Sequence, residues 1–337
     1  MRVLSIFMRP CMAQIQRMNS KQFASALVTL LAGTALLAGC AATAHDTTPT
    51  ALGVQRPAAT LEAAVDQPGP VEVETIVAAR WEVDRGGLIN LENPAAKAAG
   101  LKDGPEPIEL FVHVIRHPTR GVYLIDSGVE HAFLADPEHA LIHGMLGSMA
   151  HLDKLRIRHD TQSILAHAGA PVQGVLLTHL HLDHVLGLRD VPANVPVYVG
   201  AGDAEDSSFM NLFQRGVYDT ALERKGALRE ITFEADPSGA FKGVRDVFGD
   251  GSFWAISVPG HTPDSIAYLA RTPKGPVLLT GDACHTAWGW QHSVEPGSFS
   301  DDRAQSADSL ARLERFAAHH PSLQVRLGHQ ELPARAQ

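Results

Sequence analysis

The segment from His179 to His184 carries four side chains that can bind a metal ion within six positions. Its order is His179-Leu180-His181-Leu182-Asp183-His184. In an extended segment, residues two apart point to the same side, so His179 and His181 can bind one metal ion together. Asp183 and His184 then turn towards a second position nearby. The segment predicts a metal centre; a chance surface cluster is the alternative, because the chain contains 18 histidines.

Three further candidate ligands follow predicted strands, and each stands directly after a glycine. They are His261, Asp282 and His329. With the first four residues they make five imidazoles and two carboxylates. Such a set suits two borderline metal ions, each with three or four protein ligands, that share one carboxylate and leave room for water. The recurrence of ligands at strand ends favours a metal centre over chance.

The candidate ligands require strands whose ends meet at one edge of a sheet. Alternating or continuous apolar patterns predict strands at 71–77, 110–115, 121–125, 172–178, 195–199, 253–258, 265–270, 277–280 and 323–327. Helices are predicted at 160–168 and at 306–319, where Leu310, Leu313 and Phe316 share one face. Hairpins mixed with intervening helices predict an α+β protein in which helices cover two sheets.

This pattern resembles the metallo-β-lactamase superfamily of hydrolases over the whole folded part. The resemblance includes Leu124-Ile125-Asp126-Ser127-Gly128, which is similar to an early turn of that family with a buried aspartate. It implies an αββα sandwich, with two mixed sheets flanked by helices and a binuclear site at one sheet edge. Asp126 is then expected to support the metal loop through hydrogen bonds rather than to bind metal.

The resemblance also implies a role for each ligand. His179, His181 and His261 resemble the ligands of the first metal. Asp183, His184 and His329 resemble those of the second, and Asp282 resembles the bridge between the two. The implied cofactors are two divalent metal ions, with Zn²⁺ expected.

An aspartate at position 282 separates branches of the superfamily. Many β-lactamases of this fold carry Cys or Ser there, whereas lactonases and phosphotriesterase-like hydrolases carry Asp. The intervals from His184 to His261, Asp282 and His329 resemble those of acyl-homoserine lactonases and parathion-hydrolase relatives. Cys284 is expected to be a small core residue and not a ligand.

The implied reaction is hydrolysis of a lactone or ester by a hydroxide that bridges the two metals. Asp183 is expected to bind metal and to orient this nucleophile. Similar lactonases have a tyrosine three residues after the bridging aspartate, and this chain has His285 there. His285 is therefore a candidate proton donor or oxyanion partner; a histidine that packs beside the site without a catalytic role is the alternative.

Three other functions remain open at this stage. They are phosphotriester hydrolysis, β-lactam hydrolysis, and metal or ligand binding by a lipoprotein without turnover. The expected partner is a small-molecule substrate. The net charge of −9 argues against nucleic acid as a partner, because general nucleic-acid binders are basic. The sequence gives no indication of oligomeric state.

Residues 1–39 are predicted to be a lipoprotein signal peptide. Basic residues precede an apolar run at 23–37, and translation from either Met1 or Met18 would supply a complete signal. The run ends in Leu37-Ala38-Gly39-Cys40, which resembles a bacterial lipobox with Cys40 as the lipid-bearing residue. The expected location is the bacterial envelope, as an outer-membrane lipoprotein or in the periplasm, attached to the membrane through Cys40.

The remaining chain is divided into a linker and one domain. Residues 40–70 are rich in Ala, Thr and Pro and are predicted to be a flexible tether. Residues 71–337 are predicted to form the hydrolase domain. Two apolar segments at 141–149 and 209–213, and the side chains of Trp288 and Trp290, are candidates to cover or line the site; plain packing is the alternative.

Overall fold

The fold is that of a computed structural model, which describes residues 41–206 and 209–333. The predicted signal peptide and Cys40 lie outside these residues. Residues from Ala42 onward form one compact unit. Among the described helices, none combines the length and the apolar character that crossing a bilayer requires.

The described residues include fourteen strands, and these form two sheets, the number of sheets that was predicted. The eight-stranded sheet has the order β1-β9-β8-β7-β5-β4-β3-β6 and the six-stranded sheet has the order β14-β13-β12-β11-β10-β2. The strands of the first sheet are β1 (Thr47–Pro49), β3 (Glu72–Asp84), β4 (Pro105–His117), β5 (Gly121–Ile125), β6 (Arg156–Ile157), β7 (Val172–Leu176), β8 (Val197–Gly200) and β9 (Leu228–Ile231). Those of the second are β2 (Val54–Arg56), β10 (Val244–Asp246), β11 (Phe253–Ser257), β12 (Ile266–Thr272), β13 (Gly275–Leu279) and β14 (Gln324–Arg326).

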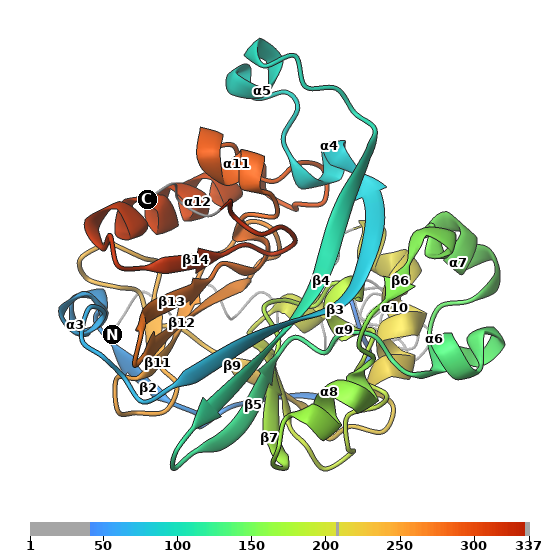
Figure 1. The fold of residues 1–337 in the computed structure, drawn as a ribbon, viewed down its shortest axis with the longest axis horizontal. Coiled ribbons are helices and arrows are strands. Elements are labelled where there is room, and N and C mark those ends of the chain that lie inside the picture. Colours follow the sequence, from blue (N-terminus) through green and yellow to red (C-terminus); the bar gives the residue numbers. More distant parts are fainter. Residues whose placement is uncertain (1–40, 207–208, 334–337) are drawn as a thin grey trace, which may run out of the picture. The chain divides into compact units, whose positions relative to one another are not determined.

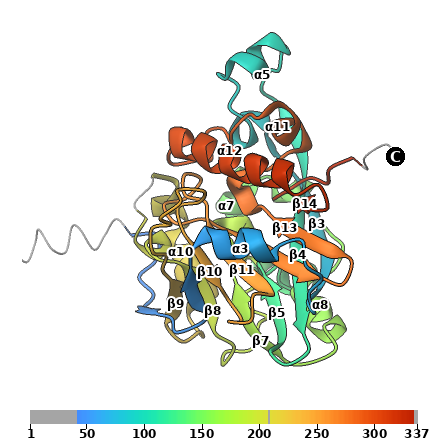
Figure 2. The ribbon, with the colours of Figure 1, turned by 90° about the vertical axis from the view of Figure 1, so that its left-hand side faces the viewer.

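Several helices lie on the outer faces of the sheets (Figures 1 and 2). The α-helices are α3 (Ala58–Ala64), α4 (Arg85–Leu88), α5 (Pro94–Ala98), α6 (Ala132–Ala135), α7 (Gly144–Met149), α8 (Thr161–His167), α9 (Leu182–Val185), α10 (Phe209–Leu222), α11 (Ala287–His292) and α12 (Arg303–His319). The 3-10 turns are η1 (Pro137–His139), η2 (Leu152–Lys154), η3 (Asp203–Glu205) and η4 (Gly281–Ala283). Helices α3 and α12 cover the six-stranded sheet, and α8, α9 and α10 pack on the other one.

The alternation of side chains along each strand builds three layers of core. In β11, Phe253 belongs to the cluster between the sheets, whereas Trp254 packs with α12 on the outer face. In β5, Tyr123 points between the sheets and Leu124 packs outward. Because successive residues of a strand point to opposite faces, a strand buried on both faces carries an unbroken apolar run. The αββα sandwich predicted from the sequence is therefore confirmed.

Both sheets are mixed, and this brings the metal loops to one edge. Strands β5 and β7 pair in parallel, and so do β13 and β14, so the segments after each pair leave on the same side. Strand β11 runs in the direction of β13, because each is antiparallel to β12. A hydrogen bond from Ile266 N to Thr178 O, 2.7 Å long, joins the end of β7 to the start of β12 across the two sheets.

The prediction of a flexible tether at residues 40–70 is wrong for the segment that begins at Ala42. Strand β1 pairs with β9, and β2 pairs with β10 at the edge of the other sheet. In α3, Leu61 is fully buried, and so is Val65 directly after the helix. The sequence pattern hid this because only a few large apolar residues stand among Ala, Thr and Pro. The folded unit therefore begins near Ala42 rather than at residue 71.

Candidate metal centre

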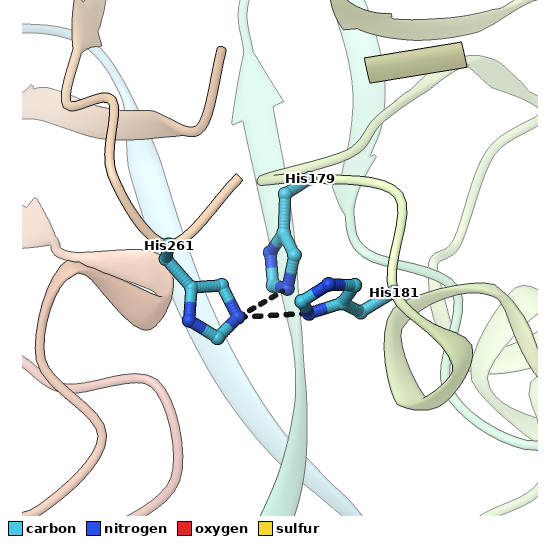
Figure 3. A group of neighbouring side chains, drawn as sticks. All are labelled: His179, His181 and His261. Atoms are coloured by element: carbon cyan, nitrogen blue, oxygen red, sulfur yellow. Dashed lines mark hydrogen bonds between the residues drawn. The ribbon is translucent and has the colours of Figure 1, made fainter. Parts of the chain in front are cut away.

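The first group of predicted ligands consists of three histidines whose ring nitrogens converge (Figure 3). His179 and His181 follow β7, and His261 follows β11. His261 Nε2 lies 2.8 Å from His181 Nδ1 and 3.1 Å from His179 Nε2. His179 and His261 are buried, and His181 is partly exposed at the opening.

The second group consists of Asp183, His184, Asp282 and His329, whose ligand atoms all lie within 4.8 Å of one another. His329 Nε2 is 3.2 Å from Asp183 Oδ2 and 3.1 Å from Asp282 Oδ2. His184 Nε2 lies 3.5 Å and 3.4 Å from the same two oxygens. The structure thus brings together all seven residues that the sequence singled out as metal ligands.

Asp282 stands between the two groups. Its Oδ2 lies 3.5 Å from His261 Nε2 and 3.7 Å from His179 Nε2, besides its contacts with the second group. This is the position that the sequence predicted for a bridging carboxylate.

Two buried atoms test whether the residues fit metal ions. His184 Nε2 and Asp282 Oδ1 are buried without a hydrogen-bond partner among the described residues. A buried polar atom without a partner is costly, because it has lost its water and gained nothing in exchange. His184 Nε2 lies within 3.5 Å of carboxylate oxygens of Asp183 and Asp282, and Asp282 meets the imidazoles through its other oxygen, Oδ2. Imidazoles and carboxylates are donors that divalent metals such as zinc accept. The residues therefore fit two divalent cations.

The pKa values of the histidines separate the two groups. Burial, reinforced by the neighbouring imidazoles, holds the pKa values of His179 and His261 well below their usual range. Burial lowers the pKa of His181 to about 4. These three rings are neutral at pH 7, so each can offer a lone pair without first losing a proton.

In the second group, nearby carboxylates raise the pKa values of the histidines more than burial lowers them. Asp126, Asp183 and Asp282 outweigh the burial of His184 and raise its pKa well above the ordinary value. Asp282 and Asp183 likewise raise the pKa of His329 to about 10. Without metal, these two rings carry protons where a cation would lie, so metal binding here must release protons.

Glycines let the ligand loops approach one another closely. A Cβ at Gly328 would lie 2.2 Å from Asp282 Oδ1, and a Cβ at Gly260 would lie 2.2 Å from the backbone nitrogen of Ser306. Gly281 has a φ of +51°, the left-handed region that glycine occupies most easily. The glycines that precede the later ligands in the sequence thus have a steric reason.

Residues outside the cluster hold several of the proposed metal ligands in place by hydrogen bonds. Asp126 Oδ1 accepts from Thr178 N at 2.8 Å, and Asp126 Oδ2 lies 2.8 Å from His184 Nδ1. Ser300 Oγ is 3.2 Å from His261 Nδ1, and the main-chain oxygen of Glu109 is 3.0 Å from His329 Nδ1. The supporting role expected of Asp126 is confirmed, whereas nothing in the sequence pattern had indicated Ser300 or Glu109.

His285 and Cys284 follow Asp282 and differ in what they contact. His285 is buried beside the cluster, with its Nε2 3.1 Å from Asp282 Oδ2. Cys284 packs against Leu310 and Leu327, and burial raises the pKa of its thiol. Cys284 is therefore a core residue, as expected.

A cleft of about 320 Å³ opens onto the ligands, and we call it the metal cleft. His181, Asp183, His261, Asp282, His285 and His329 contribute to its floor. Much of its wall is apolar and includes Trp81, Leu88, Ile108, Met149, Leu182 and Phe299. The wall includes residues of β3, β4 and the loop before α12, which the sequence analysis did not assign to the site.

The residues that line the metal cleft differ from two of the predictions about which segments cover the site. Of the segment at 141–149, only Met149 reaches it, whereas Met145 is exposed. Trp288 stacks on His292 and Trp290 packs against the outer core, so neither lines the cleft. Residues 209–213 belong to α10, and their side chains lie outside those described.

Residues 111–329 match the metallo-beta-lactamase superfamily. The N-acyl homoserine lactonase AttM of Azorhizobium caulinodans is 30% identical over 229 residues, which are 66% of this chain and 81% of that protein. The gamma-lactamase MBL2 of Gibberella moniliformis is 31% identical over 173 residues, or 48% of this chain and 70% of the relative.

Solved structures agree on the fold. A quorum-quenching N-acyl homoserine lactone lactonase superposes with a TM-score of 0.54 at 17% identity, covering 78% of this chain and 94% of that one. A Bacillus thuringiensis AiiA mutant gives 0.53 at 18% identity and covers 76% and 92%. With a matching family over more than half its length, this chain belongs to the metallo-beta-lactamase superfamily.

Proposed function

We propose that this protein is a binuclear metal-dependent hydrolase that opens lactone rings, with N-acyl homoserine lactones as the substrate class. The observation that carries the proposal is the convergence of seven ligands at the floor of a cleft with a largely apolar wall. The lactonase relative, of which this chain covers 81%, supports the same class of substrate. Two divalent cations held there would supply a nucleophilic water at neutral pH and polarise the ester carbonyl.

Asp183 is the residue we propose to orient the attacking group. Its side chain keeps 21% of its surface exposed, whereas that of Asp282 keeps only 3%. His184 and His329 outweigh the burial of Asp183 and hold its pKa below the ordinary value, so it stays ionised at neutral pH. An ionised carboxylate that faces the cleft can accept a proton from the nucleophile and present it correctly to the carbonyl.

The wall of the metal cleft suits an acyl chain. Trp81 and Ile108 are cross-strand partners in β3 and β4, and both are buried. Met149 lines the cleft and is 68% exposed, so it can move to fit chains of different length. An apolar chain against this wall would exclude water from the floor and hold the ring over the ligands.

The test is proton release by the purified protein with Cys40→Ser, loaded with zinc, on a long-chain acyl-homoserine lactone at pH 8. The proposal predicts rapid release that a chelator abolishes and that Asp183→Asn reduces at least about 100-fold. Asp136→Asn, at an exposed position on the surface, is the matched control and should keep full activity. Absence of release with both metals bound would discard this substrate class, whatever the result with an aryl phosphotriester or a chromogenic cephalosporin.

A second candidate reaction is the opening of a cyclic amide. It is favoured by the gamma-lactamase relative, of which this chain covers 70%. An amide nitrogen leaves less readily than an alkoxide and needs protonation as it departs. Comparing turnover of a γ-lactam with that of the matching γ-lactone would decide between the two, and a higher kcat/KM on the lactam would reverse the proposal.

We also propose zinc as the metal in both positions. Five imidazoles, which are borderline donors, and two carboxylates, which are hard donors, suit zinc but also tolerate manganese, iron and cobalt. Loading the metal-free protein with each metal in turn would test this. Zinc should give tight binding at two equivalents, and a higher affinity for manganese or iron would contradict it.

We propose in addition that the protein is anchored in the bacterial envelope by a lipid on Cys40, facing the periplasm. The support is the sequence at 1–40 alone, where an apolar run ends in Leu37-Ala38-Gly39-Cys40. Expression in a bacterium with radiolabelled palmitate would test it. Label should enter the wild-type protein and be lost with Cys40→Ser, and label in neither protein would contradict the anchor.

A further inference from the structure

The side chain of His285 is held in the same manner as the proposed ligand His329. His329 Nδ1 lies 3.0 Å from the main-chain oxygen of Glu109, and His285 Nδ1 lies 3.1 Å from that of Leu88. On the opposite side of each ring, Nε2 lies 3.1 Å from Asp282 Oδ2. The two rings stack nearly parallel, at 10° with centroids 5.6 Å apart. His285 thus repeats the arrangement of a residue in the ligand set.

The contact with Leu88 places a proton on Nδ1 of His285. A carbonyl oxygen can only accept a hydrogen bond, so His285 Nδ1 must donate it. A neutral imidazole carries one N–H, and its Nε2 then presents a lone pair. This lone pair faces an oxygen of Asp282, which is also an acceptor. Either a proton on Nε2 or a metal ion held by both atoms satisfies this pair.

The backbone leaves His285 little freedom to point elsewhere. The main-chain oxygen of His285 accepts from His329 N at 3.0 Å, and that of Cys284 accepts from Gly328 N at 3.0 Å. The imidazole is buried, with 1% of its surface exposed, and Leu88 beside it is buried as well. The imidazole is therefore held with its Nε2 at the cluster and is not free to turn towards solvent.

A third group of possible ligand atoms includes this nitrogen. His261, Asp282 and His285 each offer an atom within 4.8 Å of the others. The group shares His261 with the first proposed metal position and shares the proposed bridge, Asp282. The ring of His285 also meets that of His261 edge-on, with centroids 4.9 Å apart.

The geometry points to His285 as an additional ligand of the metal centre, on the His261 side of Asp282, rather than as a proton donor to the leaving group. As a ligand, His285 would offer Nε2 to the centre and keep its Nδ1–H on the main-chain oxygen of Leu88. A metal ligand oriented by an Nδ1–H bond to a main-chain carbonyl is a common arrangement in proteins. The inference rests on the proposed metal centre but not on the proposed substrate.

The experiment compares metal binding by the full-length wild-type protein, His285→Phe and His292→Phe. Phenylalanine keeps an aromatic ring and removes both nitrogens, and His292 is an exposed residue on α11 that serves as the matched control. Zinc affinities would be measured by competition with a chromogenic chelator, and Co²⁺ absorption would report the number of ligands. We expect His285→Phe to weaken one of the two equivalents by about tenfold or more and to alter the Co²⁺ spectrum. We expect His292→Phe to match the wild type in both.

The results separate this inference from the proposed function. Two equivalents bound by His285→Phe with wild-type affinity and an unchanged Co²⁺ spectrum would overturn the ligand role and leave the centre intact. Fewer than two equivalents in the wild-type protein would contradict the centre itself. Two equivalents without lactone hydrolysis would contradict the proposed substrate only.

A measurement on the wild-type protein tests the inference even if the His285→Phe variant fails to fold. Long-range ¹H–¹⁵N correlation spectra of the imidazoles report which nitrogens carry protons. In the zinc-loaded protein, we expect His285 to be protonated at Nδ1 and its Nε2 resonance to shift when zinc is added. A proton on His285 Nε2 in the loaded protein would overturn the inference.

Discussion

Asp126 Oδ2 lies 2.8 Å from His184 Nδ1, and this contact ties the end of β5 to the loop that carries four of the proposed ligands. The other carboxylate oxygen of Asp126 accepts from Thr178 N at 2.8 Å, at the point where β7 ends. Asp126 has a φ of +60°, a left-handed conformation that Asp and Asn adopt more readily than other residues. One buried carboxylate thus sets both the path of the loop and the orientation of His184.

We predict that Asp126→Ala lowers zinc affinity by about 10- to 100-fold, because His184 loses the acceptor that orients its ring. Asp126→Asn should lose less, since an amide oxygen still accepts from Thr178 N and asparagine tolerates the backbone conformation. Zinc competition against a chromogenic chelator measures both variants. An affinity of Asp126→Ala equal to that of the wild type would show that the contact does not support the metal.

Gly328→Ala should weaken metal binding and destabilise the fold. The new methyl would lie 2.2 Å from Asp282 Oδ1 and 2.9 Å from the main-chain oxygen of Gly281, so a loop at the centre must shift. Overpacking of this kind costs about 1–3 kcal/mol. Gly226→Ala is the control, because nothing lies within 4 Å of a methyl there. Denaturant unfolding with and without zinc would measure the effect, and equal losses in the two variants would refute the steric argument.

Removal of residues 1–70 should destabilise the protein relative to removal of residues 1–40. The longer deletion takes away β1, β2 and α3, together with the buried side chains of Leu61 and Val65. Burial of each such side chain contributes about 1.5–3 kcal/mol. The denaturation midpoints of the two chains, compared at equal zinc, provide the measurement. Equal midpoints would contradict this expectation and support the prediction from the sequence that residues 40–70 are a flexible tether.

His113 should make stability depend on pH in a defined direction. Burial lowers its pKa to about 3, whereas the unfolded chain has the ordinary value of 6.5. Below pH 6.5 the imidazole of His113 binds a proton in the unfolded chain but stays neutral in the folded one. The free energy of unfolding therefore falls as the pH drops from 6.5 towards 3. The slope from this group is up to about 1.4 kcal/mol per pH unit, and it vanishes above pH 6.5.

His113→Phe removes this dependence and isolates it from other titrating groups. The difference between the variant and the wild type, measured by denaturant unfolding in the presence of a chelator, should grow in favour of the variant as the pH falls. The exposed His139→Phe is the matched control for the loss of one imidazole. A constant difference between His113→Phe and the wild type from pH 7 to pH 4 would contradict the assignment.

The sequence predicted the elements that have a strong local pattern and the residues with distinctive chemistry. Helix α12 was visible because Leu310, Leu313 and Phe316 recur on one face, and all three are buried. The ligands were visible because imidazoles and carboxylates recur at strand ends. Their convergence follows from parallel pairing of β5 with β7 and of β13 with β14, which local patterns do not encode.

The cleft wall was missed because it depends on contacts between distant segments. Trp81 reads as an ordinary strand residue, and only its pairing with Ile108 across β3 and β4 forms a wall beside the ligands. Its Nε1 also donates to the main-chain oxygen of His151 at 3.0 Å, which holds the segment after α7 against the cleft. The prediction of a tether was wrong for a similar reason, because β1 and β2 form strands only by pairing with β9 and β10, which are far away in the sequence.

The central claim is that seven side chains of this protein hold two divalent cations, and metal analysis tests it most directly. The protein would be purified from zinc-replete cells, separated from free metal, and analysed for metal per chain. The account predicts two equivalents in the wild-type protein and a loss of metal on Asp282→Ala, because that residue contacts both ligand groups. Fewer than two equivalents in the wild-type protein would contradict it.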